Sequence, residues 1–286
     1  MEFTKRRERL RRYFAGNECV RPASVFDPVS SRIAEALGFE IGMLGGSIAS
    51  AAILAAPDLA VMTLTELADQ VRRINRASNI SMMVDADNGY GNALNVMRTV
   101  RELEDAGVCG MTIEDTVLPS RFGGGGKEEL IAPQEMAGKL RAAVDARTDP
   151  TTVLLGRTHA LQATSLDDAV ERVKAFSQTG VDGIFLMGVK EERHLEAARK
   201  VTGLPFMLGT TPSSLDNALL AGYGVKFALR GHLSFGAAVK AIYDSLKQQA
   251  DGGSPDDAKD SQASAEVMRI AMGNELYARW QKEYLG

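Results

Sequence analysis

The sequence predicts an α/β fold: a (β/α)8 TIM barrel with an extra C-terminal helical segment. Eight short apolar runs alternate with stretches of helical periodicity, as expected of parallel strands that are covered on both faces. The chain has 286 residues, which suits one barrel of about 250 residues. Polar residues follow several of the runs, where a barrel builds its active site. A doubly wound open sheet is the alternative, but it usually has fewer strands.

The elements follow from these runs and from the turn signals between them. We expect residues 3–15 to form an exposed helix whose basic run is a solvated face. The eight strands are expected at residues 22–26, 39–44, 80–84, 108–113, 152–155, 181–187, 204–208 and 225–229. Helices are expected up to residue 37 and at 65–77, 92–107, 133–147, 166–180, 191–201 and 234–249. Gly107 suits a helix C-terminus, and Pro133 suits a first helical turn.

The chain divides into three parts. Residues 1–249 are the expected barrel, and residues 250–262 are a mobile linker rich in Gly, Ser, Pro and Asp. Residues 263–286 are an amphipathic helical segment that the barrel does not need. Its apolar side chains recur at helical spacing and are Leu276, Tyr277, Trp280 and Tyr284. The pattern leaves open whether this segment packs on its own barrel or on a neighbouring subunit, where it would serve oligomerisation.

Composition excludes several classes of protein. The chain is 45% hydrophobic and 24% charged, which is ordinary for a soluble globular protein. A net charge of -4 gives no support to nucleic-acid binding. The basic N-terminus lacks the apolar region of a signal peptide, and no apolar run is long enough to span a bilayer. Cys19 and Cys109 do not indicate a disulfide framework. We therefore expect a cytoplasmic protein that binds neither nucleic acid nor membrane.

A pair of carboxylates at the end of the third strand is the first candidate site. Asp85 and Asp87 would share one face of a regular strand, and glycines follow them. Hard divalent cations take oxygen ligands, and Mg2+ typically uses one or two carboxylates and several waters. A solvated acidic turn is the alternative. An EF-hand loop is excluded, because its twelfth position needs Glu and holds Val96 here.

Polar residues gather where the other predicted strands end. Together with the Asp pair, the set is Ser47, Asp85, Asp87, Glu114, Arg157, His159, Thr210, Arg230 and His232. Arg157 is the most informative, because an arginine that ends a core strand needs an anionic partner. Ser47 could instead cap a helix, and His159 could be structural. The glycine-rich loop at about 118–130 is a lid or a linker; its length and position favour a lid.

Five motifs in order along these strands resemble the isocitrate lyase/phosphoenolpyruvate mutase superfamily. They are Gly45-Gly46-Ser47, Pro57-Asp58, Asp85-x-Asp87-x-Gly89-Tyr90-Gly91, Ile113-Glu114-Asp115 and Arg157-Thr158. The resemblance covers about residues 20–245. Residues 23–28 and 89–96 and the pair Gly231-His232 resemble its oxaloacetate decarboxylase family.

The resemblance implies a reaction and a set of roles. The reaction is divalent-metal-dependent decarboxylation of oxaloacetate, a small 2-oxo diacid, to pyruvate and CO2 through a metal-stabilised enolate. Mg2+ or Mn2+ would be held directly by Asp85, and through waters by Asp87, Glu114 and Asp58. Substrate binding falls to Ser47, Arg157 and His232, of which Arg157 and His232 are also catalytic. The resemblance further implies a homotetramer, a dimer of dimers, whose final helix packs on a neighbour.

Three departures from the family pattern concern the substrate. The expected lid, at residues 120–127, has neither the Cys nor the His of the superfamily's carbon–carbon lyases. Thr210-Thr211 stands where a tyrosine is expected. Arg230 replaces a neutral residue, and could accept a further substrate carboxylate. The alternatives are a 2-methylisocitrate or substituted-malate lyase and, outside enzymes, a barrel that binds 2-oxo acids without turnover.

Overall fold

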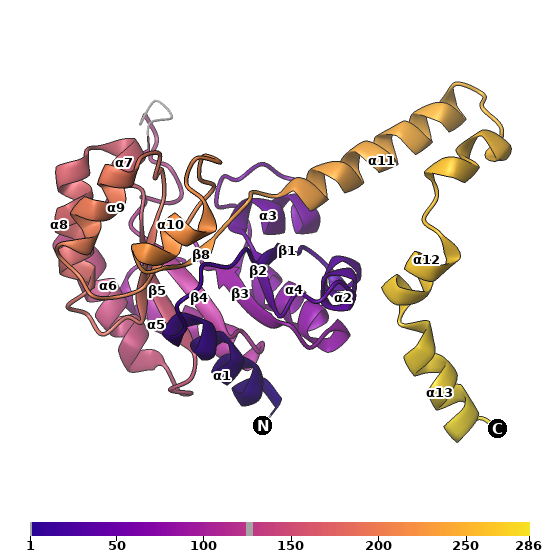
Figure 1. The fold of residues 1–286 in the computed structure, drawn as a ribbon, viewed down its shortest axis with the longest axis horizontal. Coiled ribbons are helices and arrows are strands. Elements are labelled where there is room, and N and C mark those ends of the chain that lie inside the picture. Colours follow the sequence, from indigo (N-terminus) through magenta and orange to yellow (C-terminus); the bar gives the residue numbers. More distant parts are fainter. Residues whose placement is uncertain (1, 124–127) are drawn as a thin grey trace.

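The structure is a computed structural model, which describes residues 2–123 and 128–286 (Figure 1). Residues 124–127 belong to the glycine-rich stretch that the sequence favours as a lid, and they lie outside the described residues. Within the described ranges, every helix is too short or too polar to cross a membrane.

Eight parallel strands form one sheet whose spatial order is the chain order. They are β1 (Ala23–Ser24), β2 (Ile41–Leu44), β3 (Ser81–Asp85), β4 (Gly110–Glu114), β5 (Val153–Thr158), β6 (Gly183–Leu186), β7 (Phe206–Leu208) and β8 (Val225–Ala228). Val20, just before β1, closes the ring by a parallel bridge to Phe227 of β8. The amide of Val20 donates to the carbonyl of Lys226 at 2.9 Å. The predicted (β/α)8 barrel is confirmed.

Most of the helices surround this sheet (Figure 1). Those predicted from the sequence are α1 (Glu2–Ala15), α2 (Pro28–Ala36), α4 (Leu64–Ala77), α5 (Ala93–Asp105), α6 (Pro133–Ala146), α8 (Leu166–Phe176), α9 (Glu192–Arg199) and α11 (Leu233–Ala250). Amphipathic periodicity and local caps explain most of them. In α4, for example, Thr63 and Glu66 form a capping box at the N-terminus.

Three short helices were not predicted: α3 (Gly46–Leu54), α7 (Ala160–Ala163) and α10 (Asn217–Gly222). The sequence of α3 consists of small and apolar residues and has no polar face, so it carries no helical periodicity. The fifth strand is longer than predicted and includes Arg157 and Thr158. A 3-10 helix, η1 (Pro255–Ser261), lies within the stretch expected to be a linker.

The first helix is not the exposed element that the sequence predicts. Leu10 is fully buried inside the barrel with residues such as Met43 and Phe227, and Arg6 and Arg7 are 3% and 6% exposed. Arg7 donates to the carbonyls of Val108 at 2.9 Å and Glu104 at 2.7 Å. The expectation was wrong because the basic face meets backbone carbonyls at the N-terminal end of the barrel, and not water.

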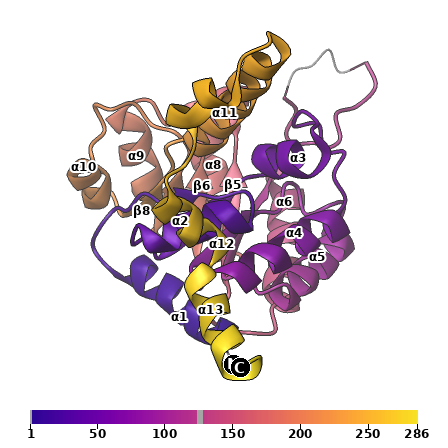
Figure 2. The ribbon, with the colours of Figure 1, turned by 90° about the vertical axis from the view of Figure 1, so that its right-hand side faces the viewer.

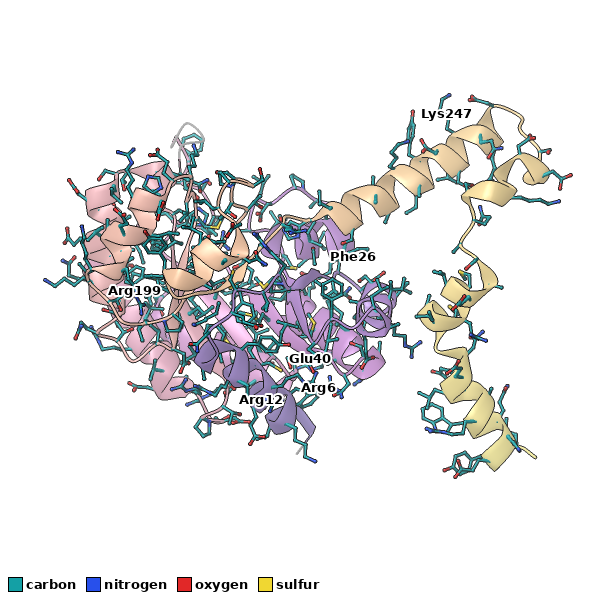
Figure 3. All side chains as sticks on the ribbon, viewed as in Figure 1. Arg6, Arg12, Phe26, Glu40, Arg199 and Lys247 are labelled. Carbon is teal, nitrogen blue, oxygen red and sulfur yellow. The ribbon has the colours of Figure 1, made fainter. Side chains whose placement is uncertain are left out.

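The chain beyond the barrel forms an arm. Helix α11 is fully described and buries none of its residues; it runs away from the barrel, with Lys247 on its distal part (Figures 1 and 3). Helix α12 (Ala265–Met272) turns back and packs against α2 (Figure 2). Arg32 of α2 donates to the carbonyl of Ala271 at 3.5 Å. Helix α13 (Asn274–Tyr284), also fully described, buries no residue.

Replacing Arg7 by Met should lower the free energy of unfolding by about 3 kcal/mol. The change leaves the carbonyls of Val108 and Glu104, and Asp149 Oδ2 at 2.7 Å from Nη1, without this donor, and each buried acceptor left unsatisfied costs about 1–3 kcal/mol. Arg12→Met on the exposed face of the same helix is the matched control, expected within about 0.5 kcal/mol of the original protein. Urea titration followed by circular dichroism measures both, and equal effects would contradict the packing of the basic face of α1 against the end of the barrel.

Candidate active site

The carboxyl ends of β3, β4 and β5 border a cavity of about 330 Å3. Its charged lining comes from these strands and from the loops beside them. The charged residues are Asp58, Asp85, Asp87, Glu114, Arg121, Glu128, Glu129, Arg157 and His159. The structure thus brings together five residues that the sequence placed in the site: the four predicted cation ligands and Arg157.

Asp85 is the last residue of β3 and is 8% exposed. One carboxylate oxygen, Oδ2, forms an ion pair with Arg157 Nη1. The other, Oδ1, accepts a hydrogen bond from Thr112 Oγ1 on the neighbouring strand at 3.0 Å. These partners fix the carboxylate at the wall of the cavity.

Asp87 reaches the same cavity by a different route from the one predicted. The strand stops at Asp85, and Asp87 has the left-handed φ of 46°, so the two carboxylates do not share a regular strand face. The amide of Asp87 instead donates to Asp85 Oδ1 at 3.3 Å, which folds the turn tightly. Burial, together with the charges of Asp85 and Glu114, raises the pKa of Asp87 to about 8.

Glu114 is the last residue of β4, and its pKa shifts in the opposite direction to that of Asp87. Its Oε2 lies 3.0 Å from Arg157 Nε, and its Oε1 accepts a hydrogen bond from the hydroxyl of Thr116. Burial works against the charged carboxylate, but Arg157 and the nearby His159 outweigh it and lower the pKa of Glu114 to about 2. Glu114 is therefore a permanent anion in the cavity wall.

Arg157 and His159, from the end of β5, complete the wall. The Arg157 guanidinium lies over the Phe185 ring of β6, 5.1 Å from its centroid, and its acidic partners raise its already high pKa. His159 also lines the cavity. Its Nδ1 lies 2.5 Å from Glu128 Oε1 and its Nε2 lies 3.2 Å from Glu114 Oε2. The sequence does not place Glu128 in the site, because nothing in a loop sequence indicates which acid faces inward.

The Gly45-Gly46 pair is explained by close approaches at the start of α3. A Cβ on Gly45 would lie 2.7 Å from His232 Cε1, and a Cβ on Gly46 would lie 2.5 Å from Asp87 Oδ1. Real Cβ atoms do not come so close, so a side chain at either position would force His232 or Asp87 to shift. The backbone of this turn is therefore what brings the Asp pair and His232 to one place.

Ser47 and His232 do not line the acidic cavity, although the sequence placed both in the site. Ser47 is the second residue of α3; the N-cap is Gly45, so the alternative of Ser47 as a capping residue is wrong. His232 is the N-cap of α11 and lies beside Gly45. Burial lowers the pKa of His232, with Asp85 opposing it, and this favours the neutral imidazole.

Three further residues near the strand ends lie outside this cavity. Arg230 is exposed and borders a separate groove between α2 and α11, so it does not meet a substrate carboxylate here. Asp115, which follows Glu114, is fully buried and forms a 3.0 Å ion pair with Arg172. Thr211 follows β7, and its Oγ1 is buried without a hydrogen-bond partner among the described residues.

The donor chemistry of the cavity fits a hard cation. Four carboxylates, Asp58, Asp85, Asp87 and Glu114, face it, and burial and mutual repulsion raise the pKa values of Asp58 and Asp87. A bound cation would relieve that repulsion. In the described part of the chain, no three acidic, His or Cys side chains stand ready to hold a metal together. The arrangement suits an ion that contacts few carboxylates directly and keeps its waters, as Mg2+ does.

Fold and site together define the class: a parallel (β/α)8 barrel with an arginine-anchored carboxylate cluster at the C-terminal ends of its strands. The sequence profile of phosphoenolpyruvate phosphomutase matches residues 10–250. The chain belongs to the phosphoenolpyruvate phosphomutase family.

Two relatives extend almost the full length of the chain. Oxaloacetate decarboxylase of Rhodopseudomonas palustris strain BisB18 is 53% identical over 269 residues, covering 94% of this chain and 93% of its own. Oxaloacetate decarboxylase of Bradyrhizobium diazoefficiens is 49% identical over 280 residues, covering 98% and 97%. Among solved structures, phosphonopyruvate hydrolase in complex with oxalate and Mg2+ superposes with a TM-score of 0.87, at 26% identity and 98% and 99% coverage.

Replacing Asp87 by Asn should stabilise the metal-free protein, and more strongly at pH 9 than at pH 5. The folded pKa of Asp87 is raised to about 8, whereas an unfolded Asp has a pKa of about 3.9. The folded state therefore keeps a proton that the unfolded state has lost, and stability falls as pH rises through this window. Asn cannot ionise, so the Asp87→Asn variant avoids this loss of stability at high pH.

Thermal unfolding in EDTA at the two pH values measures this difference. Asp105→Asn, at an exposed position on α5, is the matched control and should show no pH-dependent gain. An equal gain for Asp87→Asn at both pH values would contradict the raised pKa.

Proposed function

We propose that this protein decarboxylates oxaloacetate to pyruvate and CO2, with a divalent cation. The observation that carries the proposal is that relatives of this name share about half of their residues with nearly the whole chain. The cavity supplies a chemical rationale, because it sets a permanent cation, Arg157, among carboxylates suited to a metal ion.

We propose Mg2+ or Mn2+ as the cation, held directly by Asp85 and through waters by Asp87, Glu114 and Asp58. When bound, it would act as a Lewis acid towards the oxygen on which negative charge develops. The ion pair and the hydrogen bond on Asp85 support this role, because they orient a carboxylate before any ligand arrives. Because the pKa of Asp87 is raised, its ionised form would be stabilised most by a bound cation.

In the reaction, the C3–C4 bond of oxaloacetate breaks and CO2 departs. The electron pair passes to C3 and C2, so that negative charge appears on the C2 oxygen of an enolate. We propose that Arg157 stabilises this charge, since its guanidinium is held in place by Asp85, Glu114 and Phe185 and needs no reorganisation. Protonation of C3, from solvent or from a group not yet assigned, gives pyruvate.

We propose that Ser47 and His232 hold the carboxylates of the substrate. No side chain caps the first turn of α3, so the Ser47 hydroxyl and its backbone amide could bind one carboxylate. His232, beside Gly45, would donate a hydrogen bond to the carboxylate that departs. Both roles place the substrate between the start of α3 and the acidic cavity.

Oxaloacetate should yield pyruvate in the presence of Mg2+, while 2-methylisocitrate and 2,3-dimethylmalate should yield nothing above background. Decarboxylation needs no protonated leaving group, whereas a lyase relies on a positioned acid or base worth about 100- to 10,000-fold. The described lid residues include no Cys or His, and His159 is engaged at both ring nitrogens, by Glu128 at Nδ1 and by Arg157 and Glu114 at Nε2. NMR of the product mixture identifies every product.

Two controls belong to this experiment. Oxaloacetate with Mg2+ alone gives the uncatalysed rate, and Asp85→Ala should lose at least about 100-fold of the catalysed rate because the cation loses its direct ligand. Robust cleavage of either hydroxy acid, with oxaloacetate untouched, would replace the decarboxylase by a lyase. Pyruvate formation by Asp85→Ala at the original rate would refute the site assignment.

We propose that the protein is a cytoplasmic homotetramer, a dimer of dimers, in which residues 263–286 pack on a neighbouring subunit. The support is the apolar surface of the arm: Tyr277, Trp280 and Tyr284 of α13 are 54%, 41% and 70% exposed in the single chain. Helix α11 likewise exposes Ile242 and Tyr243. Cys19 and Cys109 are free buried thiols, in keeping with a reducing compartment.

Deleting residues 263–286 should shift the protein to smaller species in light scattering. The deletion removes the aromatic face of α13, which the single chain leaves in water. A variant that keeps the segment but carries Lys282→Ala, on the same helix, is the control and should keep the original mass. An unchanged mass after the deletion would mean that the arm packs only on its own barrel.

A further inference from the structure

Ser24 of β1 contacts the imidazole of His232. Its Oγ lies 2.9 Å from His232 Nδ1, although 208 positions separate the two residues in the chain. Ser24 is half-buried, and among the described residues its hydroxyl has a single hydrogen-bond partner, His232 Nδ1. The contact spans the closure between the last and the first strand of the barrel.

Other contacts hold Ser24 and His232 in place relative to each other. Ser234, in the first turn of α11, donates its hydroxyl to the carbonyl of Ser24 at 2.9 Å. Phe26, just after β1, packs edge-on against Phe235, with ring centroids 5.2 Å apart; Figure 3 shows Phe26 at the root of α11. Gly231 has a φ of 74°, which only glycine adopts readily, and the turn it makes presents His232.

The far side of the imidazole faces the start of α3. A Cβ on Gly45 would lie 2.9 Å from His232 Nε2, so this nitrogen looks onto the Gly45-Gly46 turn. The next residue, Gly46, donates its amide to Asp85 Oδ2 at 3.4 Å. Nε2 has no hydrogen-bond partner among the described residues, and it lies on the side of the ring from which a substrate carboxylate would come.

The serine selects between two tautomers. If Nδ1 carried the proton, it would donate to Ser24 Oγ, the hydroxyl hydrogen would have no acceptor among the described residues, and Nε2 would face the carboxylate with a lone pair. If the hydroxyl donates to Nδ1, the hydroxyl hydrogen and Nδ1 are both matched, and Nε2–H is a donor that faces the place of the carboxylate. Burial also lowers the pKa of His232, which keeps the ring neutral and makes the choice of tautomer matter.

We propose that Ser24 is a positioning residue: its hydroxyl donates to His232 Nδ1 and thereby keeps the proton on Nε2, where it is offered to a substrate carboxylate. The use of that proton rests on the proposed function, but the tautomer does not. Ser24 acts through His232 and has no contact with the reacting atoms. This part of the site is therefore built by β1 and the turn between β8 and α11 together.

Imidazole 15N NMR on the whole protein, labelled in histidine, tests the tautomer without turnover. The chain has three histidines, so His232→Asn identifies the signal of His232. We expect a protonated Nε2 and an unprotonated Nδ1 in the original protein, an averaged pair of tautomers in Ser24→Ala, and the original pattern in Ser24→Thr, which keeps the hydroxyl. A proton on Nδ1 in the original protein, or an unchanged tautomer in Ser24→Ala, would overturn the proposal.

Kinetics with oxaloacetate separates positioning from loss of structure. Ser24→Ala should raise KM by about 10-fold or more, as when an orienting partner of a ligand group is removed, with kcat nearly unchanged. A misfolded fraction would lower kcat and leave KM alone. Ser234→Ala is the matched control: it loosens α11 but keeps the Ser24–His232 contact, so tautomer and KM should stay. If oxaloacetate is not turned over at all, the proposed function fails, and the NMR result still decides the role of Ser24.

Discussion

The ion pairs of Arg157 are the interaction on which the site depends. One buried guanidinium contacts Asp85 from β3 and Glu114 from β4 and lies over Phe185 of β6. Removing a buried arginine would leave two carboxylates without their counter-charge, which is far costlier than losing a surface ion pair. Arg157 thus both joins neighbouring strands at their carboxyl ends and sets the potential of the cavity. The barrel supplies the rigid strand ends that such an arrangement needs.

Charge imbalance is the second property of the site. Arg157 satisfies Asp85 and Glu114, while Asp87 and Asp58 are left with raised pKa values among like charges. The wall of the cavity therefore has two parts. Asp85 and Glu114 are paired with Arg157, whereas the charges of Asp87 and Asp58 respond to a cation or a proton. The same two-residue turn, Gly45-Gly46, admits both the Asp pair and His232, so a side chain at either position would disturb the acids or the imidazole. Electrostatics and backbone shape are therefore coupled at one point.

The strands and the acidic cluster could be predicted from the sequence, because each strand is a buried apolar run and a barrel collects the strand ends at one face. Other features could not be predicted. The burial of Arg7 depends on carbonyls that only the closed barrel presents, and α3 has no polar face to give it periodicity. Glu128 and Ser24 are ordinary residues until a contact distant in sequence gives them a partner. Such contacts carry no local signal.

The closure through Val20 and Phe227 also has a consequence for how the protein folds. Loop-closure entropy makes pairings between the two ends of a chain costly until the elements between them are in place. The acids of β3 and β4 and the arginine of β5 come from consecutive parts of the chain and can meet early. Ser24 and His232 come from its two ends and meet only when the ring shuts. Loop-closure entropy therefore favours assembly of the acidic cluster before the contact that completes the surroundings of His232.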